Sequence, residues 1–356
     1  MKKRVLLEII LFLALCLLLV VGIRRRSFVP EISAELVSYN DPNILGIKIT
    51  SIGQEVYDSV DYEVYGRAQY KEGTVEPIIE SYKSQPMGDL HLEQIRTACS
   101  LSKEIYGEGT DSECEVYVLT PKEDLKEDFS IMYVHGGSYV MDLPEAEFRF
   151  CDELAQMTHA RVYIPRYRPV FHGTYEEAYA LLSDVYRDMC ATSQVTAITG
   201  ASAGGGLALG FVEYLNETGE KIPDKMVLFS PWVDTTFSNP SVSDYTQRDR
   251  LLGPYGLSLM GALWAGDLDP SDYHISPIYG DFSRSMPDTL IYIGTEEIMF
   301  PDAELLYEKM RSNGHSVRMV RGEGLFHVYM LADLPEAEKA KEIAVDFLCD
   351  QMRYWN

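Results

Sequence analysis

A glycine-rich turn between a strand and a helix constrains this sequence more than any other feature. Residues 200–206 read G-A-S-A-G-G-G; they follow the β-branched run at 195–199 and open a stretch rich in Ala, Gly and Leu. Glycines two residues before and after the central serine remove side chains that would keep the strand and the helix apart. Ser202 is therefore predicted to project from a sharp turn at a helix N-terminus, where the helix dipole favours a developing negative charge. The alternative interpretation is a glycine-rich turn with an incidental serine.

Strand and helix patterns alternate through most of the chain. The run at 131–134 is short and entirely apolar, as expected for a strand buried on both faces of a parallel sheet. Further strands are predicted at 161–164, 195–199, 225–229, 289–293 and 316–320, and helices at 144–158, 175–189, 203–214, 302–310 and 336–352. This alternation predicts an α/β protein with a mostly parallel central sheet flanked by helices.

Two stretches interrupt that rhythm. Residues 60–105 read as polar amphipathic helix, and residues 236–275 are too long for an ordinary connection. Neither stretch shows a long apolar face suited to a lipid surface. We therefore predict an N-terminal segment at 1–26, a linker and helical cap region at 27–111, and a catalytic domain at 112–356 in which 236–275 forms a lid.

The N-terminal segment is predicted to be a membrane anchor. Residues 5–23 are apolar or small except for Glu8, and such a run is long enough to cross the hydrocarbon core as a helix. A cleaved signal peptide is the alternative, but the run is longer than a usual signal core and no small-residue cleavage site follows it. Basic residues at 2–4 and 24–26 nearly balance each other. The positive-inside rule then gives a slight preference for a single-pass protein with its catalytic domain outside the cytoplasm.

A second glycine-containing loop follows the apolar run at 131–134. Residues 135–138 read H-G-G-S, and glycines in such a loop let backbone N–H groups turn toward a substrate oxygen. The N–H of the residue after the nucleophile adds another donor. The predicted oxyanion hole consists of Gly136, Gly137, Ser138 and Ala203.

These two loops together resemble the H-G-G-G and G-D-S-A-G-G motifs of the hormone-sensitive-lipase-like esterases. The resemblance covers residues 112–352 and includes S-P-W-V-D at 230–234 and F-H-V at 326–328. It implies the α/β-hydrolase fold with an N-terminal helical cap and, given the apolar leader, a layout similar to that of arylacetamide deacetylases. Two residues depart from the motifs, Ala201 in place of Asp and Ser138 in place of the third Gly. Both departures bear on substrate preference rather than on mechanism.

The other two catalytic residues are predicted after later strands. The resemblance places an acid three residues after Gly294, at Glu297, with Glu296 and Asp302 as competing candidates. His327 is the only histidine after a predicted late strand, which makes it the candidate base. Ser202 would attack the substrate, His327 would accept its proton, and the acid would orient the imidazole.

Composition and missing motifs disfavour other functions. A net charge of −24 repels nucleic acid, and the six cysteines lack C-x-x-C spacing and form neither a disulfide framework nor a zinc pattern. Because the chain contains no H-E-x-x-H, phosphate-loop or dinucleotide motif, we expect no metal and no cofactor. The prediction is a serine carboxylesterase or deacetylase for short acyl esters. A catalytically inactive binding module and a lipase or peptidase of the same fold are the alternatives, and the oligomeric state stays open.

Overall fold

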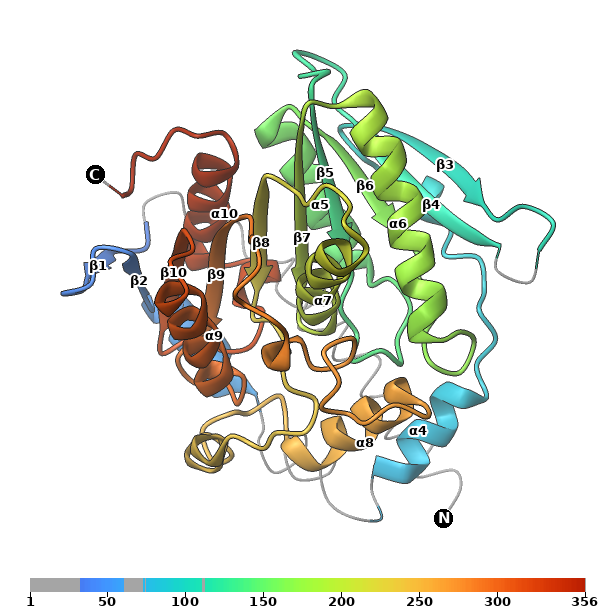
Figure 1. Cartoon of the computed structure of the whole chain (residues 1–356). Helices are drawn as coiled ribbons and strands as arrows, with labels where there is room; N and C mark the ends of the chain where they lie inside the picture. The colour runs from blue at the N-terminus through green and yellow to red at the C-terminus, as the bar shows by residue number, and fades with distance from the viewer. Residues whose placement is uncertain (1–32, 61–72, 74, 111–112, 356) are drawn as a thin grey trace.

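A single mixed sheet runs through the molecule. The computed structural model describes residues 33–60, 73, 75–110 and 113–355, and within these ranges ten strands form a sheet in the order β1-β2-β10-β9-β8-β7-β5-β6-β4-β3 (Figure 1). Neighbouring strands from β2 to β6 are parallel, whereas β1, β4 and β3 are antiparallel to their neighbours. The strands are β1 (Leu36–Ser38), β2 (Ile44–Lys48), β3 (Ser100–Tyr106), β4 (Cys114–Thr120), β5 (Phe129–Val134), β6 (Arg161–Pro165), β7 (Val195–Ala201), β8 (Lys225–Phe229), β9 (Asp288–Gly294) and β10 (Val317–Glu323). The predicted mostly parallel sheet is confirmed.

The middle of the sheet is closed to water on both faces. Every residue of β5 and β8 is buried, which explains why these strands read as continuous apolar runs rather than as alternating patterns. Strand β5 pairs with β7 in a register that sets Val134 opposite Gly200. The loop at 135–138 and the turn at Ser202 therefore leave the sheet side by side.

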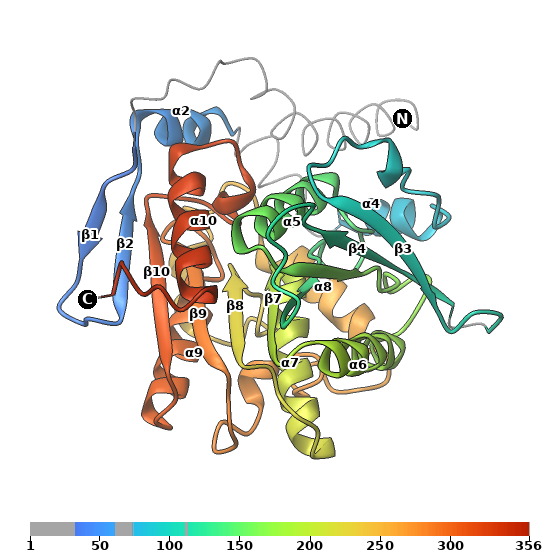
Figure 2. The ribbon, with the colours of Figure 1, turned by 90° about the horizontal axis from the view of Figure 1, so that it is seen from above.

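Helices cover the two faces of the sheet as separate layers. The helices α5 (Glu145–Thr158) and α10 (Pro335–Leu348) lie on one face, and α6 (Tyr175–Thr192), α7 (Ala203–Thr218) and α9 (Phe300–Ser312) lie on the other (Figure 2). Two separate hydrophobic clusters correspond to these layers. Helices on both faces are what a parallel sheet requires, because neither of its faces can be left to solvent.

Smaller helices gather beyond the ends of the central strands. Figure 1 shows α4 (Val75–Lys83) and α8 (Pro254–Ala265) together at the lower side of the molecule. They are joined by a hydrogen bond of 3.0 Å from the Tyr255 hydroxyl to Glu76 Oε1. The predicted lid at 236–275 contains α8 and the short 3-10 helix η3 (Pro240–Asp244).

The N-terminal part of the fold differs from the prediction. The region at 27–111 was expected to be linker and cap, but it supplies β1, β2 and β3, so the sheet does not begin at residue 112. Within the stretch at 60–105 that reads as amphipathic helix, residues 92–99 contain only the 3-10 turn η2 (Leu92–Gln94). Asp152 explains the ending of this turn, because its carboxylate accepts hydrogen bonds of 2.9 Å from the backbone N–H groups of Ala98 and Cys99 and holds them away from helical partners.

The predicted anchor at residues 5–23 lies outside the described residues. Across 33–60, 75–110 and 113–355, no helix combines the length and the apolar character that crossing a membrane requires. The anchor, its retention and its orientation stay predictions.

Candidate active site

Ser202 occupies a strained turn at the end of β7. Its backbone has φ 54° and ψ −122°, a conformation that a residue with a side chain rarely adopts. A Cβ added at Gly200 would lie 2.4 Å from the carbonyl oxygen of Gly204, and one at Gly204 would lie 2.1 Å from that of Val134. These are backbone atoms that cannot move aside, so the glycine spacing is a steric requirement of the turn.

A histidine and a glutamate complete a hydrogen-bonded chain to this serine. His327 Nε2 lies 2.9 Å from Ser202 Oγ, and His327 Nδ1 lies 2.5 Å from Glu297 Oε2. Glu297 is fully buried and His327 is nearly so. The structure thus brings together three residues that the sequence places after β7, β9 and β10. In this arrangement the carboxylate can hold the imidazole with Nε2 directed at the serine hydroxyl.

Ser230 supports the carboxylate, a role that the sequence did not reveal. Its hydroxyl donates to Glu297 Oε1 at 2.7 Å and accepts from the N–H of Val328 at 3.1 Å. The N–H of Gly294 donates to the same carboxylate oxygen at 2.7 Å. The sequence contained a signal in the S-P-W-V-D segment after β8, but nothing in that segment indicates which group the serine faces.

The competing acids have other surroundings. Asp302 Oδ1 accepts a hydrogen bond of 2.8 Å from Asn239 Nδ2, which comes from the segment before η3. Burial, together with the nearby charge of Asp234, raises the pKa of Asp302 to about 7. Glu296 is partly exposed, and its charge contributes to the raised pKa of Tyr57. Of the three candidates, Glu297 is the one hydrogen-bonded to His327.

Among the described residues, three of the four N–H groups predicted to form the oxyanion hole are free, two in the loop at 135–138 and one at the start of α7. The N–H groups of Gly137, Ser138 and Ala203 have no hydrogen-bond partner within the described part of the chain. The prediction for Gly136 is wrong, because its N–H donates to the buried carboxylate of Glu147 at 2.9 and 3.1 Å. An amide that already serves a charged acceptor is not available to a substrate oxygen.

A second buried carboxylate links the lid segment to the acid. Asp249 accepts hydrogen bonds of 2.8 Å from the N–H groups of Leu251, Leu252 and Ile298, and Ile298 follows the acid directly. Burial raises the pKa of Asp249 to about 6, while its hydrogen bonds and the charge on His327 lower it. Nothing in the sequence indicates this contact, because the two segments are far apart along the chain.

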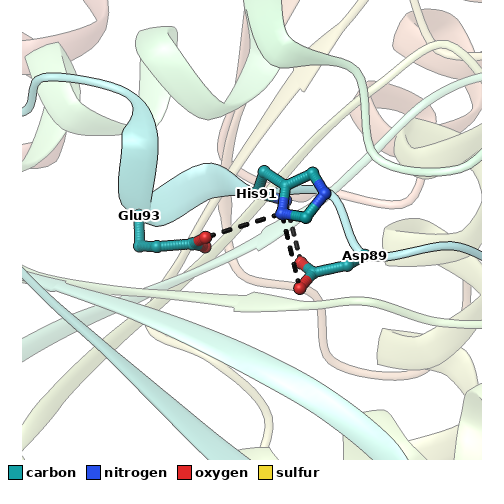
Figure 3. Close-up of side chains that lie close together, drawn as sticks. All are labelled: Asp89, His91 and Glu93. Carbon is teal, nitrogen blue, oxygen red and sulfur yellow. Dashed lines mark hydrogen bonds and ion pairs between the residues drawn. The ribbon is translucent and has the colours of Figure 1, made fainter.

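One group of side chains has the spacing of metal ligands. Asp89, His91 and Glu93 lie together on the surface, with His91 Nδ1 3.5 Å from Asp89 Oδ2 and 3.6 Å from Glu93 Oε1 (Figure 3). All three side chains are exposed. Each carboxylate lies within ion-pair distance of the imidazole, so the cluster is explained without a metal. We assign no metal to them.

Comparison with known proteins agrees with this geometry. Residues 131–331 match the family described as alpha/beta hydrolase fold. An acetyl-hydrolase from Streptomyces hygroscopicus is 30% identical over 225 residues, which cover 62% of this chain and 75% of that protein. An esterase from Acinetobacter venetianus is 27% identical over 229 residues, 61% of this chain and 73% of that protein. The crystal structure of an esterase from the bacterial hormone-sensitive lipase family matches with a TM-score of 0.69 at 21% identity, over 85% of this chain and 99% of that one.

The fold and these relatives together define the chain as a hydrolase. The chain belongs to the alpha/beta hydrolase fold family, and within it the chain is a carboxylic ester hydrolase. The predicted α/β-hydrolase fold with a mostly parallel sheet flanked by helices, and the predicted enzyme class, are confirmed.

Proposed function

We propose that this chain is a carboxylesterase that hydrolyses short acyl esters through an acyl-enzyme on Ser202. Ser202 Oγ attacks the ester carbonyl while His327 Nε2 takes its proton, and Glu297 stabilises the imidazolium. The N–H groups of Gly137, Ser138 and Ala203 stabilise the oxyanion. His327 then protonates the departing alcohol. In the second half-reaction His327 takes a proton from the water that attacks the acyl-enzyme, and returns it to Ser202 Oγ as the acid product leaves. One observation carries the proposal: His327 is hydrogen-bonded to Ser202 at 2.9 Å and to Glu297 at 2.5 Å.

Two observations support a short acyl group. The acetyl-hydrolase from Streptomyces hygroscopicus is named for removing a two-carbon acyl group. Next to Ser138, the buried ring of Tyr139 stacks on Trp264 with centroids 4.7 Å apart and on Trp232 at 5.5 Å. All three rings are buried, so the side of the oxyanion loop at Tyr139 is packed with side chains, which favours a small acyl group.

The test is a comparison of acyl lengths on the full chain. Specificity constants for p-nitrophenyl acetate, butyrate and palmitate are measured with and without detergent micelles, with Ser202→Ala as the inactive control. We expect acetate or butyrate to be preferred, and a fluorophosphonate probe to label the parent but not the variant. Absence of both labelling and hydrolysis would establish the inactive binding module instead.

A lipase is the second candidate, because one helix near the site has an apolar outer surface. Helix α8 contains no charged residue, and Tyr255 and Leu263 are 37% and 39% exposed on it. These exposed side chains are the part of the lid that a lipid surface could contact. A preference for palmitate that strengthens on micelles would identify the lipase.

The membrane attachment is a separate part of the proposal. Residues 5–23 would hold the enzyme to a bilayer as a single span, with the catalytic domain outside the cytoplasm. Extraction of membranes from expressing cells with alkaline carbonate tests the span. We expect the full chain to stay with the membranes; its complete release would refute the anchor. Proteolysis of the catalytic domain in intact cells tests the orientation.

A further inference from the structure

Three buried side chains hold the peptide groups of the oxyanion loop. The Tyr167 hydroxyl donates to the carbonyl oxygen of His135 at 2.9 Å, and the next N–H, that of Gly136, donates to Glu147. The carbonyl oxygen of Gly136 lies 2.8 Å from His135 Nδ1. A carbonyl oxygen can only accept, so His135 carries its proton on Nδ1.

These bonds set the direction of a catalytic donor. The peptide group is planar and trans, so the carbonyl of Gly136 and the N–H of Gly137 point in opposite directions. Fixing the first at His135 therefore directs the second away from it. The loop has little slack, because a Cβ at Gly136 would lie 2.8 Å from the carbonyl oxygen of Ala201 and 3.0 Å from Glu147 Oε1.

We propose that Glu147 is a positioning residue of this esterase: its ionised carboxylate holds the Gly136 N–H and thereby keeps the following N–H groups aimed at the oxyanion. The inference rests on the proposed mechanism, since it presumes that these N–H groups bind an oxyanion. Glu147 is 5% exposed, lies on α5, and also accepts a hydrogen bond of 2.9 Å from the Tyr133 hydroxyl. A carboxylate is a stronger acceptor than a neutral carboxyl or amide, so the hold depends on its charge.

The surroundings of Glu147 place its titration within the working range of the enzyme. Burial raises its pKa to about 7, whereas the Gly136 N–H, the Tyr133 hydroxyl and the charge on His327 lower it. The titratable groups that face it from the packed elements are Tyr133 on β5, Cys151 on α5, Tyr167 after β6 and His327 after β10. Burial raises the pKa of Tyr133, Tyr167 and Cys151 further above their ordinary values, so these three stay neutral when Glu147 ionises.

The decisive variant is Glu147→Gln, measured in the full chain with p-nitrophenyl acetate. Below pH 6 the parent carries a neutral carboxyl that resembles the amide, so kcat/KM of parent and variant should agree within about twofold. Above pH 8 the parent is ionised, and we expect it to exceed the variant about tenfold through kcat, with KM unchanged. The loss of an oxyanion donor costs about a hundredfold or more, and a misaimed donor should cost less.

A second variant moves the same titration. Tyr133→Phe removes a donor that favours the charged form of Glu147. When Glu147→Gln is made in a chain that already carries Tyr133→Phe, the advantage of the glutamate over the amide should therefore develop at higher pH. Glu213→Gln is the control. Like Glu147, Glu213 is a buried carboxyl, but it lies on α7 against Gly280 and away from the oxyanion loop. It should leave kcat/KM and its pH profile unchanged.

The outcomes separate this inference from the proposed function. A parent–variant ratio that rises with pH and shifts with Tyr133→Phe supports it. A ratio near one throughout, or a constant ratio at every pH, overturns it, because a merely structural loss does not follow the charge. If Glu147→Gln does not fold, a pH profile in Tyr133→Phe identical to the parent's overturns it. A parent that neither hydrolyses esters nor reacts with fluorophosphonate refutes the function itself.

Discussion

The centre and the edges of the sheet are built on different principles. In the centre, β5 and β8 are buried along their whole length. The backbones that follow these strands pass so close to the start of α7 that only glycine fits there. At the edge, β3 is mostly exposed and joins the sheet by antiparallel pairing with β4 alone. The centre fixes the positions of reacting atoms, whereas the edge completes the sheet and tolerates water. Substitutions should therefore have effects that fall steeply from the centre to the edge.

The largest effect is expected at the acid behind His327. Glu297→Gln should lower kcat by about a thousandfold or more, because an amide cannot stabilise the imidazolium and favours the wrong tautomer. Asp302→Asn is the matched control; its buried carboxyl faces Asn239, and kcat should stay within about threefold. Steady-state kinetics with p-nitrophenyl acetate measures both. The reverse ranking would place the catalytic acid on α9.

A methyl group added at the turn around Ser202 should lower the stability of the fold. Gly204→Ala places a Cβ 2.1 Å from the carbonyl oxygen of Val134 and 2.3 Å from that of His135, and neither backbone atom can yield. We expect a loss of more than about 3 kcal/mol in the free energy of unfolding, at the upper end of overpacking effects. Gly88→Ala is the control, since nothing lies within 4 Å of its added Cβ. Denaturant unfolding should leave the control near the parent, and equal stability of both variants would contradict the steric argument.

A smaller effect, a change of stability that depends on pH, is expected at Glu213 on α7. Burial raises the pKa of Glu213 from its ordinary value of 4.5 to about 9. The folded state then binds a proton that the unfolded chain releases, so this group contributes stability below pH 4.5 and loses that contribution as pH rises toward 9. Glu213→Gln stays neutral and should lose less stability between about pH 5 and 9. Melting temperatures across that range decide it, and parallel curves would refute the raised pKa.

The smallest effect is expected at the β1 edge. The Tyr39 hydroxyl donates to Glu323 at the end of β10, beside partly exposed strands. Tyr39→Phe should cost about 1 kcal/mol or less, the net value of one hydrogen bond near solvent, and leave kcat unchanged. Urea unfolding measures the first quantity. A larger loss than for Gly204→Ala would reverse the order of centre and edge.

This contrast also explains what could be predicted from the sequence. The turn at Ser202 and the residues Glu297 and His327 follow strand ends, and each lies in a short motif that can be recognised from the sequence alone. The place of β2 in the sheet could not be predicted, because its partner β10 lies far along the chain, with Met319 opposite Ile44, and β1 joins the sheet only through β2. Glu147 escaped notice because a carboxylate within an amphipathic helix reads as a surface residue. The prediction that the Gly136 N–H faces the oxyanion is wrong for the same reason, because the sequence does not show that Glu147 accepts this N–H.

The three hydrogen bonds at Asp249 have a consequence for how substrates reach the serine. Two of these bonds lie within the lid, because Leu251 and Leu252 belong to it as Asp249 does, and the third joins the lid to Ile298. A lid that swung away as a rigid flap would break this third bond or pull Ile298, and with it Glu297, out of place. Opening and catalytic competence would then be mutually exclusive. We therefore expect substrates to enter the active site through rotations of individual side chains, while the backbone of the lid stays in place. Inhibitors should accordingly bind in one fast phase, without the slow tightening that marks enzymes whose covers must close.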